Sequence, residues 1–549
     1  MSGTFSAKNR AKVLDQLQTT QFDMIIIGGG ITGAGILLDA QLRGLNCCLI
    51  EMQDFSEGTS SRSTKLIHGG LRYLKQFNFK LVNETGKERN TLAHIARHLT
   101  RRKKVMLPAL KNGSFSKFQL RIALWVYEKF ARVPKGLRHS SYSTEGFIKE
   151  VPGINKNDLL GGVEYIEFQS NDSRLTIEVI KRGVDEGGIV LSRLKVLEMI
   201  RGENEKIAGV TAIDTLTEEI INIKADCVIN ATGPWSDKLF PDNNNSVFAR
   251  LKPTKGVHLV FDEQRFKLSK AVYFDTPDGR MIFAIPEAGK VYIGTTDTFF
   301  EGDTANPGIT SKDVSYLLDA CNNMFPDFKL NCSDITGGWS GVRPLIHQAN
   351  KKPSEISRKY ETIYDKAGLF TILGGKLTGY RKMAKKIVDR AIQKKFSTRE
   401  LKDCTTSDCE LIGSDFKDEY HFKQIEQDFL AESKRLGWGH KEAQWVFQHF
   451  GSESFKILQN DVNTNGDVPE YLVKSLLYTL SNEMVMSPSD FFVRRTNLFH
   501  FNPALVEEHY NDLADIVYDS IGASSEYRSN ENTRFASMLD SVKRLQNGL

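Results

Sequence analysis

Apolar and polar positions near the start of the chain form blocks that predict a strand, a helix and a second strand. Residues 24–27 are all apolar, which is typical of a strand buried on both faces of a parallel sheet. Three glycines interrupt this run, and apolar residues then recur at helical spacing over 31–43 until Gly44. A second strand is expected over 46–50, closed by Glu51. A short helix over 11–19 precedes the unit.

The same alternation returns far downstream. We expect a helix over 175–184, strands over 189–191, 228–231 and 369–373, and a helix over 377–392. Residues 255–297 instead alternate apolar and polar positions around turns such as PDG, which indicates an antiparallel sheet. Beyond a polar linker near residue 400, helical patterns dominate. The nucleotide-binding fold is therefore expected to be assembled from separated pieces of chain.

These patterns predict an α/β protein with a Rossmann-like domain built from discontinuous segments, an antiparallel-sheet substrate (cap) domain and a C-terminal helical domain. The first two share residues 20–400: the Rossmann-like segments cover about 20–75, 166–240 and 335–400, and the cap segments about 76–165 and 241–334. The helical domain is placed at 401–549.

Composition narrows the class of protein. No apolar run approaches the roughly 18 residues that cross a bilayer, and the first twenty residues lack the apolar centre of a secretory signal. Seven cysteines without a C-x-x-C motif indicate a reducing compartment, so we expect a cytoplasmic protein. A redox pair of Cys404 and Cys409 is the alternative. No Cys/His cluster has ligand spacing, so no metal site is expected.

Charge is distributed unevenly. Residues 401–549 carry 14 Lys and Arg against 24 Asp and Glu, whereas 97–135 carry eleven basic residues and one acid, Glu128. A basic surface can attract nucleic acid, anionic lipid or an anionic substrate. Within 116–136, one predicted helical face holds Phe118, Ile122, Trp125 and Val126 between basic residues. Such a helix either lies at a membrane interface or packs its apolar face on the core.

The glycines after the first strand have the spacing Gly28-x-Gly30-x-x-Gly33, with Glu51 at a distance of 21 residues from Gly30. In such a motif the first glycine permits a tight turn, the second lets the backbone approach a pyrophosphate, and the third lets helix and sheet pack closely. The helix N-terminus favours the phosphates, and the acid accepts hydrogen bonds from a ribose. The pattern predicts dinucleotide binding, with a glycine-rich turn of another α/β domain as the alternative.

The next stretch selects among dinucleotides. Residues 52–74 are rich in hydroxyls and glycine and fit a long cofactor, FAD, better than a nicotinamide cofactor. Here the chain resembles the FAD-dependent, quinone-linked glycerol-3-phosphate dehydrogenases and the α-glycerophosphate oxidases. The resemblance rests on five motifs: IIIGGGITGAGILLDA (25–40), TSSRSTKLIHGGLRYL (59–74), INATGPW (229–235), WSGVRPL (339–345) and GGKLTGYRKMA (374–384). YIGTTDT (292–298) and KGVHLVF (255–261) are also similar.

The resemblance implies oxidation of sn-glycerol 3-phosphate to dihydroxyacetone phosphate, with hydride transfer from C2 to N5 of FAD. Arginine suits the phosphate because its planar fork donates paired hydrogen bonds. The substrate is expected to meet Arg72, Tyr73, Arg343, Arg358 and Lys376. Arg343 is also expected to be catalytic, and Thr296 and Asp297 can bound the cavity.

Histidine can take the hydroxyl proton near neutral pH. His68 is preferred for this role and His258 is its rival. Residues expected to contact FAD are Gly28, Gly30, Ile31, Thr32, Gly33, Glu51, Thr59, Ser60, Ser61, Lys65, His68, Val196, Ala231, Thr232, Gly233, Gly375, Lys376, Leu377 and Thr378.

The resemblance leaves the electron acceptor open. A quinone would place the enzyme peripherally on the inner face of the cell membrane, against anionic lipid, whereas the oxidases form hydrogen peroxide from dioxygen. No EF-hand pattern is present, which disfavours the calcium-regulated type. An amine or amino-acid oxidase of the same fold and a flavin-free scaffold are the remaining alternatives. We expect a homodimer and no nucleic-acid partner.

Overall fold

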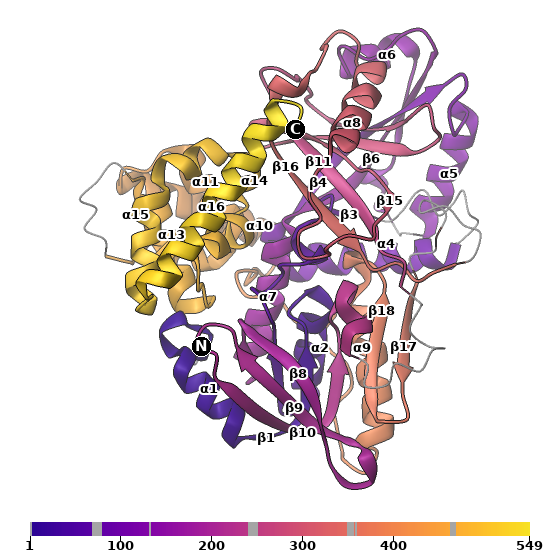
Figure 1. The fold of residues 1–549 in the computed structure, drawn as a ribbon. Helices are drawn as coiled ribbons and strands as arrows, with labels where there is room; N and C mark the ends of the chain where they lie inside the picture. Colours follow the sequence, from indigo (N-terminus) through magenta and orange to yellow (C-terminus); the bar gives the residue numbers. More distant parts are fainter. Residues whose placement is uncertain are drawn as a thin grey trace.

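The computed structural model describes residues 3–68, 79–130, 133–239, 251–348, 356, 359–461 and 468–549. Two sheets stand above one another, and the C-terminal helices cover one flank of both (Figure 1). This arrangement confirms the predicted fold class. Within the described ranges, no helix combines the length and the apolar character needed to span a bilayer.

The first sheet contains the predicted strand–helix–strand unit. β1 (Gln21–Ile27) runs parallel to β2 (Cys47–Ile50) on one side and to β10 (Ile220–Asn230) on the other. Its strand order is β17-β18-β10-β1-β2-β7, with β9 beside β10 and β8 beside β9. The other strands are β7 (Ile189–Leu191), β8 (Leu194–Arg201), β9 (Ile207–Asp214), β17 (Tyr360–Tyr364) and β18 (Leu369–Gly374).

Helices cover this sheet where the hydrophobic pattern predicts them. α2 (Ile31–Leu42) packs against α7 (Asp172–Asp185) and α9 (Tyr380–Lys395), and α1 (Arg10–Thr19) lies against β10. Thiols on β2 and β10 belong to this core, and burial raises the pKa of the Cys227 thiol to about 12. All seven cysteines are free thiols.

The second sheet is antiparallel except where β4 (Thr100–Leu110) runs parallel to β12 (Ala271–Asp275). Its order is β15-β11-β14-β13-β12-β4-β6-β3, with β16 beside β11 and β5 beside β6. The remaining strands are β3 (Leu66–Ile67), β5 (Ser140–Tyr142), β6 (Leu159–Ser170), β11 (Thr254–Asp262), β13 (Met281–Glu287), β14 (Lys290–Gly294), β15 (Thr298–Phe299) and β16 (Ile335–Arg343). Its helices are α4 (Phe79–Ile95), α5 (Lys117–Phe130), α6 (Thr144–Glu150) and α8 (Ser311–Met324).

Two short segments differ from the predicted division of the chain. β16, which we expected in the Rossmann-like segment 335–400, pairs along β11 in the second sheet, and β3 also lies there although it falls within 20–75. Buried and half-buried residues alternate along most of β16, as in an antiparallel strand with one covered face. The chain therefore crosses between the sheets at both places.

The C-terminal helices are α10 (Glu419–Arg435), α11 (His440–Phe450), α12 (Ser454–Leu458), α13 (Glu470–Asn482), α14 (Leu498–Phe501), α15 (Pro503–Ile521) and α16 (Ser525–Gln546), with a π-helical turn at Asp490–Arg495. Apolar side chains of α13, the π-helical turn and α15 join the core of the first sheet: Leu476, Phe491 and Leu513 belong to the same hydrophobic cluster as Met24 and Ile36. α10, α11 and α12 form a separate cluster around Phe429 and Phe447. The later C-terminal helices thus complete the core of the first sheet.

Candidate functional site

A cavity of about 630 Å³ lies where the two sheets meet. Its wall takes residues from the turn after β1, from loop 51–68, from the region after β10, from β13 and β16, and from the link between β18 and α9. Segments far apart in the sequence therefore form one site.

The turn after β1 is shaped by glycine. Gly28 has φ +110°, and a Cβ there would lie 2.7 Å from the carbonyl oxygen of Ala231. A Cβ on Gly33 would lie 1.9 Å from the oxygen of Gly28, and one on Gly30 would lie 3.0 Å from Ser60 Oγ. Glycine thus permits the tight turn at 28 and the close packing of α2 at 33, and at position 30 it leaves space in which a ligand can approach the backbone.

Loop 51–62, called the cofactor loop below, is held against this turn. Glu51 accepts hydrogen bonds from Gly29 N (2.7 Å) and Gln53 N (2.8 Å), and Ser60 Oγ accepts one from Ile31 N (2.9 Å). Burial raises the pKa of Glu51 to about 7, although both backbone donors oppose this shift. The first turn of α2 also carries N–H groups that its own helix cannot satisfy. The unsatisfied N–H groups at the start of α2 suit the phosphates of a dinucleotide, and the acid at Glu51 suits its ribose.

Cationic side chains line the cavity from both sheets. Arg343 ends β16, and its guanidinium lies 3.2 Å from Asp297 Oδ1 and donates to Thr295 Oγ1 at 3.0 Å. Gly256 on the neighbouring strand leaves room for it, because a Cβ there would lie 2.3 Å from Arg343 Nη2. Lys376 lines the cavity from the link between β18 and α9. Arginine and lysine together fit an anionic ligand.

The two candidate histidines occupy different places. His68 lines the cavity, with its ring edge-on to Phe283 at 6.4 Å between centroids. His258 lies behind the wall: it is 1% exposed, its ring stacks on Trp339, and Nε2 is 2.9 Å from Thr64 Oγ1. Burial, with a smaller effect of Arg343, lowers the pKa of His258 well below its ordinary value. Of the two, only His68 lies where a ligand in the cavity can reach it.

Most of the predicted contact residues meet at this cavity. Those that line it are Gly28, Gly30, Ile31, Thr32, Glu51, Thr59, Ser60, His68, Val196, Ala231, Thr232, Gly233, Arg343, Gly375, Lys376, Leu377 and Thr378. Thr296 is buried and accepts a hydrogen bond from Val257 N, while Asp297 holds Arg343. Arg72, Tyr73 and Arg358 lie outside the described residues.

Three predicted FAD contacts do not line the cavity. Gly33 packs against Gly28, and Ser61 is buried. Lys65 is buried as well, and its ammonium lies 2.7 Å from Asp172 Oδ1 and 3.2 Å from both Ser61 O and Asn497 Oδ1. The Lys65 charge is thus neutralised within the protein, and its expected contact with FAD stays a prediction.

Several residues of the wall were missed by sequence reasoning: Arg62, Tyr165, Glu167, Lys195, Trp235, Lys238, Tyr273, Met281, Phe283 and Thr295. Arg62 and Trp235 lie inside motifs quoted above, so the neighbouring motif residues could have indicated that these two side chains also line the cavity. Glu167 carries no such signal, because it lies within β6 and its role depends on contacts with Arg89 and Tyr127 from distant helices.

Comparison with known proteins agrees with this geometry. Residues 23–379 match the family of FAD-dependent oxidoreductases, and residues 404–528 match the C-terminal domain of α-glycerophosphate oxidase. The chain is 41% identical to an aerobic glycerol-3-phosphate dehydrogenase of Staphylococcus haemolyticus, over 97% of this chain and 96% of the relative. It is 42% identical to that of Staphylococcus aureus, over 94% of each.

A solved structure extends the likeness to three dimensions. The glycerol-3-phosphate dehydrogenase from Bacillus halodurans, complexed with FAD, superposes with a TM-score of 0.84 at 36% identity and 98% coverage of both chains. The arrangement of the two sheets and the C-terminal helices is thus that of a known architecture. The chain belongs to the FAD-dependent oxidoreductases that carry the C-terminal domain of α-glycerophosphate oxidase.

Proposed function

We propose that the protein oxidises sn-glycerol 3-phosphate to dihydroxyacetone phosphate at this cavity and passes the electrons to a membrane quinone. The observation that carries the proposal is the convergence of Arg343, Lys376 and His68 on the wall of the cavity that begins at the glycine turn. The names of the relatives found over nearly the whole chain support the same substrate.

The residues at the glycine turn fit FAD. Gly28 and Gly30 would let the pyrophosphate approach the backbone, Glu51 would accept hydrogen bonds from the ribose, and Ser60 would hold the cofactor loop beside them. When bound, FAD supplies the acceptor for the hydride that leaves C2 of the substrate. The other requirements of the reaction fall to the protein.

The protein must hold a phosphate dianion and remove one proton. Arg343 and Lys376 supply charge-assisted hydrogen bonds to the phosphate oxygens, and Asp297 keeps the Arg343 fork oriented. His68 accepts the proton of the C2 hydroxyl while the hydride departs with both electrons of the C–H bond, which leaves the ketone. Histidine is the side chain that most often takes this role in general base catalysis.

Substrate and acceptor can be tested in one cuvette. Anaerobic addition of sn-glycerol 3-phosphate is expected to bleach the flavin band of the purified holoenzyme, whereas glycerol, which lacks the phosphate, is not. A soluble quinone analogue should then restore the band faster than air does. If the flavin band did not bleach, the proposed substrate would be wrong. If the reduced flavin were rapidly reoxidised in air with stoichiometric formation of hydrogen peroxide, the electron acceptor would be dioxygen and not quinone.

Helix α5 supports a place at the membrane surface. One face of the helix, with Leu120, Leu124 and Tyr127, is buried against the second sheet. Three apolar side chains on another face remain exposed: Phe118 by 70%, Ile122 by 48% and Trp125 by 57%. Val126, expected on that face, is half-buried and packs on the core instead. One side of the helix thus packs on the core, and the exposed side supports the interpretation as a membrane contact.

The exposed face of α5 lies among cations. Lys117, Arg121 and Lys129 stand on the same helix, and the Lys129 ammonium lies 5.2 Å from the centre of the Trp125 ring. Aromatic and aliphatic groups flanked by cations suit an interface with anionic lipid. Such a contact would bring the enzyme to the bilayer in which quinone dissolves.

Vesicle binding tests this contact. The holoenzyme is expected to co-sediment with phosphatidylglycerol vesicles more than with phosphatidylcholine vesicles, and the variant F118S/I122S/W125S should lose most of this binding. The matched control removes two exposed apolar side chains from α10 and its end, Tyr420→Ser with Leu436→Ser, and should bind as before. Equal binding of wild type and the triple variant would exclude α5 as the contact.

A further inference from the structure

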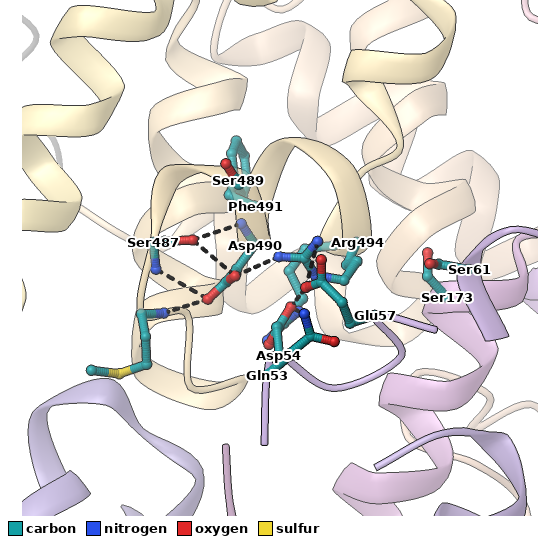
Figure 2. A network of polar contacts seen from close by, with 12 residues as sticks. Gln53, Asp54, Glu57, Ser61, Ser173, Ser487, Ser489, Asp490, Phe491 and Arg494 are labelled. Carbon is teal, nitrogen blue, oxygen red and sulfur yellow. Dashed lines mark hydrogen bonds and ion pairs between the residues drawn. The ribbon is translucent and has the colours of Figure 1, made fainter. Parts of the chain in front are cut away.

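Buried charges connect the cofactor loop to the C-terminal helices (Figure 2). Asp54 and Glu57 of the loop and Arg494 and Arg495 of the π-helical turn are all less than 9% exposed. Arg495 donates to Asp54 through both terminal nitrogens, at 2.8 and 3.0 Å. The Arg494 guanidinium donates to Asp54 as well and lies 3.0 Å from Glu57 Oε2. One turn of the C-terminal region thus binds both Asp54 and Glu57.

Arg494 is held in place from its own side. Asp490, one turn earlier, accepts a hydrogen bond from Arg494 Nη2 at 2.6 Å. Asp490 is fixed in turn by the backbone N–H groups of Met486 and Ser487, at 2.9 and 3.0 Å. Burial would raise the pKa of Asp490, but the guanidinium groups of Arg193 and Arg494 outweigh it and hold this pKa far below its ordinary value. The guanidinium therefore has one defined position.

The far end of the network reaches the cavity. Glu57 lines the cavity wall, in the same loop as Glu51, and the adjacent Ser56 donates from its backbone to Gly29 O at 3.0 Å. Arg534 on α16 also contacts Glu57, at 3.0 Å. Burial alone would raise the pKa of Glu57, but Arg494 and Arg534 outweigh this effect and lower it. The loop that carries the expected ribose ligand is therefore fastened to the C-terminal helices by ion pairs.

We propose that Arg494 is a positioning residue for the cofactor, through which the C-terminal helices hold the cofactor loop closed and slow the release of FAD. The proposal rests on FAD as the cofactor and is independent of the substrate.

Removal of Arg494 would not strand an acid. Asp54 would keep Arg495, Glu57 would keep Arg534, and Asp490 would keep Arg193 at 2.7 Å. The severe cost of a lone buried charge is therefore avoided, and the fold should survive. The loop, in contrast, would lose the one side chain that joins Asp54, Glu57 and Asp490 together. Loop position is thus the property that this substitution should change.

The test measures FAD release from the holoenzyme without substrate. Holoenzyme is diluted into flavin-free buffer, and the increase in flavin fluorescence gives the dissociation rate. Arg494→Gln is expected to raise this rate about tenfold to 100-fold, the range that loss of one charge-assisted hydrogen bond gives. Arg494→Lys, which keeps the charge but not the fork, should fall between Gln and wild type.

The double variant Asp39→Asn/Arg43→Gln is the matched control. Arg43 is equally buried and pairs with two acids, Asp39 and Asp389, both at 2.7 Å, but it lies at the C-terminal end of α2 and does not contact the loop. The change at Asp39 avoids a lone buried carboxylate, and Asp389 would keep Lys385 at 2.7 Å. FAD release from the control should be as slow as from wild type, and thermal unfolding at saturating FAD should show that the control and Arg494→Gln are folded. A wild-type release rate for Arg494→Gln, or an equal acceleration in the control, would overturn the proposal.

A second variant covers the case in which Arg494→Gln does not fold. Glu57→Gln keeps the shape of the acid and removes its charge, and faster FAD release is expected from it as well. Unchanged release from a folded Glu57→Gln protein would then refute the role of the network. Because no glycerol phosphate is added, the outcome is separate from that of the proposed reaction.

Discussion

A methyl group at Gly256 should impair the reaction although no charged residue is replaced. The added Cβ would lie 2.3 Å from Arg343 Nη2 and 2.5 Å from Thr295 Oγ1, well inside the contact distance of about 3.4 Å or more for nonbonded atoms. The guanidinium must therefore move by about 1 Å and give up its bond to Thr295. A shift of that size in a binding group costs about 100-fold in rate. This corresponds to about 2.7 kcal/mol at 1.36 kcal/mol per factor of ten.

The assay is the anaerobic bleaching of flavin by sn-glycerol 3-phosphate, followed by stopped flow over a range of concentrations. For Gly256→Ala we expect kcat/KM near one hundredth of the wild-type value, with normal flavin content and a normal unfolding midpoint. Gly136→Ala is the control, because a Cβ there meets no atom within 4 Å. If Gly256→Ala contained full flavin and reacted at the wild-type rate, the position of Arg343 would not matter for the substrate.

Two further predictions concern buried charges. Burial, reinforced by Arg174 and Lys181, lowers the pKa of His98 well below its ordinary value, so the folded protein resists a proton that the unfolded chain takes up. The contribution of His98 to the free energy of unfolding should therefore be fully present above pH 6.5. Below that pH it should fall by at most about 1.4 kcal/mol per pH unit. Between pH 7 and pH 5.5, the melting temperature of His98→Gln should decline less than that of wild type. Lys65→Met should lower the free energy of unfolding by about 3–5 kcal/mol because it strands Asp172, and Asp172→Asn in the same chain should restore part of it in urea titrations. If Lys65→Met lost its flavin while its free energy of unfolding was unchanged, Lys65 would instead be a residue that binds the cofactor.

Local patterns predicted the parts of the structure that are themselves local. The apolar run before Gly28, the helical spacing after it and the acid at Glu51 all lie within one strand–helix–strand unit, and the structure places them as expected. The spacing from Gly28 to Gly33 is informative because the close approach that requires glycine at 33, to the oxygen of Gly28, lies within the motif itself.

Sequence reasoning could not place residues whose positions depend on distant partners. Lys65 sits in a motif with cavity-lining neighbours, yet Asp172 from another helix determines where its charge lies. His258 and Arg343 come from adjacent strands, and only the strand pairing shows that one is behind the wall and the other in it. Arg494 stands in a segment with no motif at all, so its contact with the cofactor loop could not be anticipated.

The central place of β1 in the first sheet has a consequence for synthesis on the ribosome. β1 emerges from the ribosome almost 200 residues before its neighbour β10. β18, which pairs with β10, follows only near residue 370. Until then the nascent chain exposes unpaired strand edges, and such edges invite association with other chains. Folding dominated by such distant pairings is slow. Prematurely terminated products that end before β18 should therefore aggregate, whereas the finished chain has every long strand of this sheet paired.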